Sequence, residues 1–263
     1  MNVYISPLNP INFTDKNDEK SGELERSYVQ QFVSGDIITL QVLTTTELIR
    51  FQIGEKIFAS IRKTVDGKII NYNNIETSEL PSNELLEVKI IAFSSNETKT
   101  YTATNLIEIV PPYDNLKLIE YTNNSNISAF DTYFDGFKFS LRLPVGFKST
   151  SIKNRLASET FRNQNQELKI LYSAPYQTQT LIIGDSMGVP TWMAKLFNSI
   201  FCLSDITIDG EKYVRSDDSV PEKVGGIEGY PLHIYQMEVE KVNKNIEIEI
   251  SNINEDFNED FQQ

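Results

Sequence analysis

The sequence predicts a mainly β protein with two domains: an N-terminal immunoglobulin-like β-sandwich and a C-terminal antiparallel β domain with one packed α-helix. Short apolar runs alternate with turn residues along most of the chain, which is typical of strands. Only one stretch has the spacing of an amphipathic helix. Pro111-Pro112 separates two regions, in a chain of 263 residues whose 40% hydrophobic content suffices for two cores.

These observations divide the chain into four segments. We expect an arm at residues 1–27, the β-sandwich at 28–112, the β domain at 113–251 with its helix at 190–204, and an acidic tail at 252–263. Each segment has its own sequence pattern.

The first segment begins with a short strand-like piece, Val3-Tyr4-Ile5, followed by two prolines and a polar, acidic stretch. Proline interrupts regular structure, and a polar stretch has too few apolar side chains to offset its ordering entropy. We therefore expect an extended arm that becomes ordered only in an assembly. Val3, Tyr4 and Ile5 are candidate interface residues.

The second segment consists of short strand-like runs without a helical pattern between them. The expected strands are residues 37–44, 56–65, 68–72, 85–93 and 101–110. Asp66-Gly67 lies between two of these runs, and this dipeptide favours a two-residue hairpin turn. Strands at this spacing predict a β-sandwich of immunoglobulin-like size.

The third segment is also rich in strand patterns. The expected strands are residues 116–121, 135–143, 168–172, 180–183, 206–208 and 212–214, followed by a hairpin over 239–249. In one of these runs Phe137, Phe139 and Leu141 alternate with polar residues, so one face of that strand is buried. Asp209-Gly210 is expected to turn one strand back into the next.

The predicted helix at 190–204 starts with Pro190, a residue that suits the first turn of a helix. Two adjoining rows at i, i+4 spacing carry its apolar side chains: Trp192, Leu196, Ile200 and Met193, Phe197, Phe201. A stripe this broad predicts a helix that packs on a sheet. Cys202 follows on the same helix, where we expect an inert, buried thiol.

The acidic tail contains a four-residue unit, Asn-Glu-Asp-Phe, that occurs twice in succession and ends at Phe257 and Phe261. Two interpretations stand side by side. Such tails are commonly solvated chain ends. Alternatively, the unit is a short linear motif whose phenylalanines dock into pockets of a neighbouring subunit, which makes Phe257 and Phe261 candidate interface residues.

Charge and cysteine content exclude several classes of function. The net charge of −13 argues against nucleic-acid binding by phosphate neutralisation, which needs clustered lysine and arginine. One cysteine permits no intramolecular disulfide. The start of the chain lacks the pattern of a signal peptide, and no apolar run is long enough to span a membrane. We expect a protein that is made in a cytoplasm and leaves it only inside an assembled particle.

One five-residue pattern matches a hydrolase. Gly184-Asp-Ser-Met-Gly188 has the spacing of a nucleophile elbow, follows a strand-like run and lies upstream of His233. In an elbow, however, the helix starts directly after the serine, whereas here Val189 and Pro190 intervene. The strand-helix alternation of a hydrolase sheet is also missing. We therefore expect Ser186 and His233 to be structural and the protein not to be an enzyme.

Metal and phosphate sites are equally disfavoured. One histidine and one cysteine exclude the usual zinc sites. The aspartates that might bind calcium are explained as turn or loop residues: Asp205, Asp209, Asp217 and Asp218. Gly225-Gly226 lacks the strand and the lysine of a phosphate loop. We expect no cofactor and no metal.

A resemblance to a known family adds a functional expectation. From Glu159 to Glu222, two strand-like runs, the helix and a hairpin follow one another with few spare residues, and residues 28–41 place an aromatic segment before a Gly-Asp turn and a strand. In this order of elements the chain resembles virion structural proteins of tailed phages and prophages of Bacteroides-type hosts, including crAss-like phages.

The resemblance implies a multimeric ring subunit of the neck or tail, placed around the DNA path and without catalytic residues. The implied partners are further copies of the chain, the portal and tail components, and the implied location is the virion, assembled in the cytoplasm of the host bacterium. The alternative is a carbohydrate- or receptor-binding β-sandwich of a virion fibre, with Trp192 and surface tyrosines as stacking platforms. A tryptophan on an amphipathic helix belongs more often to a core.

Overall fold

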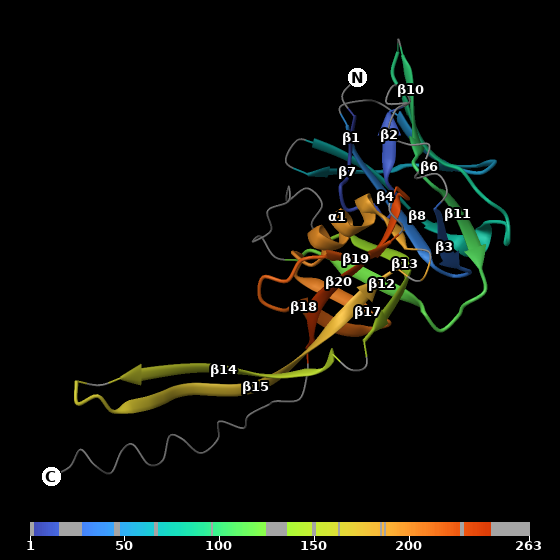
Figure 1. Ribbon diagram of the computed structural model, residues 1–263. Coiled ribbons are helices and arrows are strands. Elements are labelled where there is room, and N and C mark those ends of the chain that lie inside the picture. The colour runs from blue at the N-terminus through green and yellow to red at the C-terminus, as the bar shows by residue number, and fades with distance from the viewer. Residues whose placement is uncertain are drawn as a thin grey trace.

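The structure is a computed structural model (Figure 1) that describes residues 3–15, 28–44, 48–65, 68–95, 97–124, 136–148, 151–162, 164–184, 186, 188–226 and 229–242. Within these residues the chain is mainly β with one α-helix, which confirms the predicted fold class. The immunoglobulin-like form of the N-terminal domain stays a prediction. Phe257, Phe261 and the second strand of the hairpin expected at 239–249 lie outside the described residues.

Two sheets and a parallel strand pair form the N-terminal half. One sheet has the order β1 (Val3–Ile5), β4 (Ile37–Thr44), β8 (Lys68–Glu76) and β7 (Ile61–Val65). The other has the order β2 (Phe13–Asp15), β10 (Thr98–Ala103), β9 (Val88–Phe93), β5 (Leu48–Ile53) and β6 (Lys56–Ala59). The pair is β3 (Val29–Val33) with β11 (Leu106–Val110), and a short 3-10 helix spans Thr77–Glu79. Apolar side chains of both sheets meet in one core, as in a sandwich.

Residues 3–15 are not the expected free arm. β1 pairs antiparallel with β4, and β2 pairs antiparallel with β10. Leu8 and Ile11, between these strands, are 2% and 1% exposed and therefore belong to cores. Local patterns missed this arrangement because a three-residue strand is fixed by a distant partner strand. The remainder of the expected arm, residues 16–27, lies outside the described residues.

Two of the predicted N-terminal strands are each divided in two. The run at 56–65 forms β6 and β7, which belong to different sheets, and the run at 101–110 contributes to β10 and β11. Both runs change sheet at a polar corner, formed by Ser60 in one case and by Thr104 and Asn105 in the other. The expected two-residue connection after β7 agrees with the register, which places Val65 opposite Lys68.

Six strands of the C-terminal half close into an antiparallel barrel. Their order is β12 (Leu116–Thr122), β13 (Lys138–Phe147), β15 (Leu168–Ile183), β20 (Leu232–Lys241), β18 (Glu211–Arg215) and β17 (Asp205–Ile208), which returns to β12. Two short strands, β16 (Val189–Pro190) and β19 (Glu222–Gly226), pair with β20 outside this ring. The turn expected at Asp209-Gly210 is confirmed, and both residues have the positive φ that such a turn requires.

The helix α1 (Thr191–Ile200) is shorter than the expected 190–204, and Pro190 is its N-cap. Met193, Phe197 and Ile200 are fully buried in the core of the barrel domain, as the apolar stripe predicts. Cys202, expected to be buried, is exposed. The helix ends two residues earlier, so the chain turns and Cys202 no longer follows the buried stripe.

The two halves are tied together where β4 lies near β13. Ser140 donates a hydrogen bond to Ile37 O over 2.5 Å, and Thr39 donates one to Lys138 O over 3.0 Å. Next to them, Arg142 Nε lies 2.6 Å from Asp36 Oδ2, in an ion pair whose carboxylate is 5% exposed. These bonds link the domains through buried polar groups. None of the helices in the described part of the chain has the length and apolarity that crossing a membrane requires.

Candidate assembly interface: a projecting hairpin

A long hairpin leaves the barrel and extends away from the rest of the molecule (Figure 1). It consists of β14 (Lys153–Arg162) and the first part of β15, from Leu168 to Thr178. The second part of β15 lies in the barrel between β13 and β20. Ten residues of strand span about 33 Å, so the hairpin is about as long as a small domain is wide. The residues at 168–172 and 180–183, expected as two short strands, belong to this single strand.

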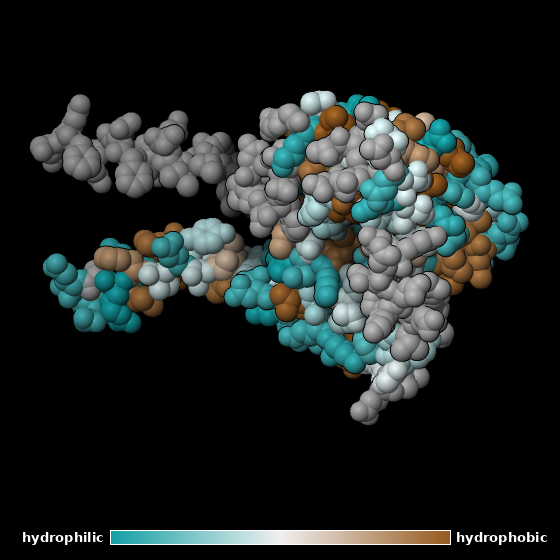
Figure 2. Space-filling view, turned by 90° about the horizontal axis from the view of Figure 1, so that it is seen from above, coloured by the Kyte–Doolittle hydropathy of each residue, from teal (hydrophilic) through white to brown (hydrophobic). Residues whose placement is uncertain are grey.

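Large apolar side chains are exposed along the hairpin. Their exposed fractions range from 54% to 70%, and they are Leu156, Phe161, Leu168, Ile170, Leu171 and Tyr172. Figure 2 shows hydrophobic, brown surface on the hairpin where it stands clear of the body. Several large apolar side chains exposed on one short element mark an interaction site.

The register places apolar side chains on both faces of the hairpin. Leu156 lies opposite Pro175, and Ile170 lies opposite Thr160, which puts an aliphatic row on one face. Phe161 and Tyr172 lie on the other face. A bulge makes this possible, because Leu171 is an additional residue without a cross-strand partner, so Ile170 and Tyr172 point to opposite sides. Neither face is polar enough to be a purely solvated surface.

The hairpin also carries unpaired strand edges. β14 pairs with β15 and with no other strand in the described part of the chain, and the distal half of β15 likewise pairs only with β14. An isolated two-stranded ribbon is at best marginally stable in water, and free edges readily accept another strand. The hairpin therefore fits a contact in which a neighbouring molecule covers its faces or pairs with its edges.

A cluster of charges holds the base of the hairpin to the barrel. Glu238 on β20 forms ion pairs with Lys153 and with Arg155, whose Nη2 lies 2.7 Å from the carboxylate. The hydrogen bond from Lys153, together with that from Arg155, lowers the pKa of Glu238 below its ordinary value, against the opposing effect of burial. The backbone N–H of Glu238 donates to Ser219 Oγ over 2.7 Å and fixes the strand on its other side.

This cluster predicts a pH effect. Because the pKa of Glu238 is lower in the folded protein, its contribution to stability is present above its unfolded pKa of about 4.5 and is lost as the pH falls through the folded value. We expect the free energy of unfolding, measured by urea denaturation between about pH 5 and pH 3, to fall less steeply in Glu238→Gln than in the wild type. The Lys153→Gln/Arg155→Gln variant should show the same shallower profile. An unchanged slope in Glu238→Gln would contradict this assignment.

The residues of the hydrolase alternative do not form a catalytic arrangement in the described part of the chain. Val189 pairs with His233, so the glycine-rich turn lies beside the histidine backbone. The ring, however, places Nε2 3.4 Å from Lys223 Nζ, and its Nδ1 is buried without a partner. Burial and the nearby lysine lower the pKa of His233. A triad histidine instead needs a carboxylate on one nitrogen and the serine on the other.

Two of the four aspartates considered for calcium, Asp205 and Asp209, bind protein cations and backbone. Asp205 accepts a hydrogen bond from Lys212 over 2.5 Å, and this contact lowers the pKa of Asp205. Asp209 accepts from the backbone of Leu118 and pairs with Lys117 over 3.0 Å. In the described residues no three histidine, cysteine, aspartate or glutamate side chains gather as metal ligands would.

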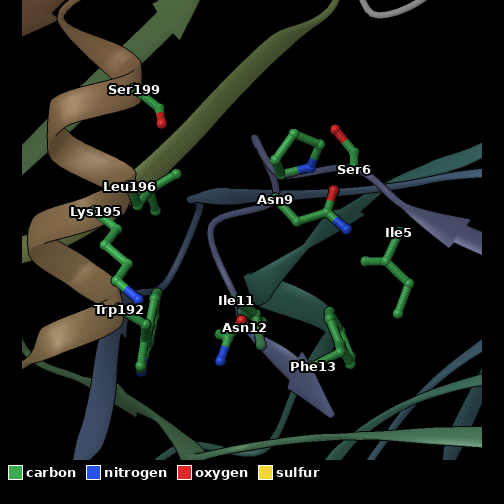
Figure 3. A pocket seen from close by; sticks show the side chains of 11 residues that line it. Ile5, Ser6, Asn9, Ile11, Asn12, Phe13, Trp192, Lys195, Leu196 and Ser199 are labelled. Carbon is green, nitrogen blue, oxygen red and sulfur yellow. The ribbon is translucent and has the colours of Figure 1, made fainter. Parts of the chain in front are cut away.

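A hollow of about 280 Å³ lies between α1 and residues 5–13 (Figure 3), and we call it the α1 cavity. Trp192, Lys195, Leu196 and Ser199 line it from the helix. Trp192 is only half-buried, and its Nε1 has no hydrogen-bond acceptor among the described residues. The tryptophan thus lines a hollow between the domains and does not lie on an open flat surface, which disfavours the stacking platform of the fibre alternative.

The residues of the first interface candidate lie in the N-terminal sheet. Tyr4 is 50% exposed, whereas Val3 and Ile5 are partly buried against the core. The sequence analysis did not predict the hairpin. The signal that could have indicated it is the polar stretch 163–166 between two strand-like runs, each of which has apolar residues at both odd and even positions and therefore on both faces.

Comparisons with protein-family models, with curated proteins and with solved structures found no match.

Proposed function

We propose that the protein is a structural subunit of a phage particle, of which several copies form a ring around the DNA path in the neck or tail. The projecting hairpin, apolar on both faces, is the observation that carries the proposal, and the resemblance to phage virion proteins supports it. Its partners are further copies of the chain, the portal and tail components, and its location is the virion, assembled in the host cytoplasm. It acts through its interfaces, without catalysis and without a cofactor.

A ring follows if the hairpin of one copy docks on the body of the next. Such a contact joins two different surfaces, and a head-to-tail contact closes into a ring when its rotation permits. A neighbouring strand can supply main-chain hydrogen bonds to the free edges, while its side chains cover the apolar faces. The interface thereby removes the apolar surface that a single chain leaves in water.

Charge does not add to this contact. Residues 153–183 hold four basic and two acidic side chains, but Lys153 and Arg155 are paired with Glu238 of the same chain, so the projecting part carries two basic and two acidic side chains and is neutral. The hairpin contact therefore rests on apolar burial, and the remainder of the chain carries the whole net charge of −13. The acidic body has a use around DNA, because a negative wall repels phosphate and lets a duplex pass without sticking.

The proposal is tested by measuring the mass of the assembly in solution. We expect the wild type to form multimers of its 30.1 kDa chain, and Phe161→Thr/Ile170→Thr, with one change on each face, to weaken association about a hundredfold. Threonine keeps the strand propensity, and both side chains are exposed, so the free energy of unfolding should change little.

The matched control is Ile57→Thr/Leu85→Thr, which removes two equally exposed apolar side chains from the N-terminal domain. It should leave the mass of the assembly as in the wild type. A wild type that stays monomeric at every concentration, by light scattering and by electron microscopy, would refute the ring. Equal association of the hairpin variant and the wild type would show that the hairpin is not the contact.

A further inference from the structure

We infer that the α1 cavity receives a phenylalanine of the Asn-Glu-Asp-Phe units in the C-terminal tail of a second copy. The tail would then be a second assembly contact beside the hairpin. The inference deepens the proposed function. It rests on that function in one respect, because it requires a neighbouring copy of the chain. It assigns an occupant to a hollow that has none in the described chain.

The size and the apolar part of the walls suit a phenyl ring. The hollow has a volume of about 280 Å³ and is open to solvent, so a side chain can enter it, and a benzene-sized ring needs only about 150 Å³. Apolar walls come from both sides: Ile5, Ile11 and Phe13 from the N-terminal strands, and Trp192 and Leu196 from α1 (Figure 3). A ring inserted between Phe13 and Trp192 gains aromatic contacts in addition to apolar burial.

The charge at the cavity suits the residues that precede each phenylalanine. Lys195 is its charged lining residue, and it has no ion-pair partner among the described residues. The first turn of α1 carries no acidic side chain and no side-chain cap, so its positive end is uncompensated. Each unit of the tail supplies a glutamate and an aspartate directly before the phenylalanine. A carboxylate at this position is attracted by both the lysine and the helix end.

The spacing of the unit matches this arrangement. In an extended peptide, residues i and i+2 point to the same side, about 6.6 Å apart. Glu255 and Phe257 therefore present a carboxylate and a ring to one surface, and Glu259 and Phe261 do the same.

The tail starts about 30 Å from the cavity of its own chain, a distance that its length can span, so the choice of a second copy as the acceptor rests on the hairpin contact of the proposed function. The start of β20, Leu232, pairs with Pro190 beside α1, whereas its last residue, Lys241, lies about 30 Å further along the strand. Glu240 pairs with Thr178, where the hairpin leaves the barrel. The tail thus starts at the end of the barrel from which the hairpin reaches a neighbour, and its fifteen residues up to Phe257 span up to about 50 Å.

Trp192 is the only tryptophan of the chain, so its fluorescence reports on the cavity. The reporter is the full chain with Phe257→Ala/Phe261→Ala, which keeps the cavity and lacks the rings. The donor is the full chain with Trp192→Phe, which is silent and keeps the tail. We expect the reporter emission to change saturably as donor is added. A donor that also carries Phe257→Ala/Phe261→Ala keeps the hairpin and should have no effect.

Lys195→Glu in the reporter should weaken the effect of the donor about five- to tenfold, and added salt should weaken it as well. If donor leaves the emission unchanged while the wild type still forms multimers, the inference is overturned and the ring stands. If the chains do not associate at all, a synthetic peptide of residues 252–263 tests the cavity separately, and its failure to change the emission also overturns the inference. A difference between wild type and reporter that is independent of concentration would place the tail in its own cavity and overturn the second-copy assignment.

Discussion

Replacing Phe197 by alanine is expected to lower the free energy of unfolding by about 3 to 5 kcal/mol. Phe197 is fully buried, and it packs beside Phe201, with 6.2 Å between the ring centroids, in the core of the barrel domain. Truncation removes the ring and leaves a cavity that the surrounding strands cannot fill, because a closed barrel has little freedom to collapse. Urea denaturation followed by circular dichroism measures the change.

Lys195→Ala on the exposed side of the same helix is the control for Phe197→Ala. Alanine is a strong helix former, and no core contact is lost, so the free energy of unfolding should stay within about 0.5 kcal/mol of the wild type. A loss below about 1 kcal/mol for Phe197→Ala would show that the ring does not contribute to a sealed core.

Arg142→Ala is expected to lower the free energy of unfolding by about 3 kcal/mol. Its guanidinium bonds Asp36 and also donates from Nη1 to Leu116 O over 3.2 Å. Without it, a carboxylate that is 5% exposed would remain buried at the domain junction without a cation. The uncompensated charge is the main cause of the loss, since among the described residues the Asp36 carboxylate then keeps a single hydrogen bond, from the backbone N–H of Val33.

A variant without either charge separates the effect of the unpaired carboxylate from the rest of the effect on unfolding. Arg142→Met/Asp36→Asn removes both charges and retains most of the volume, so it should be more stable than Arg142→Ala alone. Equal stability of the two variants would mean that the lost packing of the arginine, and not the unpaired carboxylate, determines the result. A loss below about 1 kcal/mol for Arg142→Ala would show that the pair is well solvated.

Local sequence patterns correctly predicted the elements that are stabilised by residues close to them in the sequence. The alternation around Phe139, the stripe of α1 and the turn at Asp209-Gly210 all predicted what the structure shows. Elements that depend on distant strands were missed. The pairing of β1 with β4 and the closure of the barrel by β15 and β20 join residues far apart in the chain, and no short window contains both partners.

The hairpin was missed for a different reason. An apolar run such as Leu168 to Tyr172 has the composition of a buried strand, and the sequence does not state which molecule buries it. Only the structure shows that the chain itself leaves these side chains exposed. The α1 cavity likewise could not be predicted from local sequence patterns, because Phe13 and Trp192, which both line it, come from opposite halves of the sequence.

One strand, β15, belongs to both the hairpin and the barrel, and this has a mechanical consequence. When a neighbouring molecule binds the hairpin and pulls along it, the pulling force acts on β15 along the axis of the strand. The hydrogen bonds to β13 and β20 are perpendicular to that axis, so the load acts on them in shear and they must break together. In the proposed ring, tension would therefore be distributed over whole barrels, and the hydrogen bonds would not break one at a time.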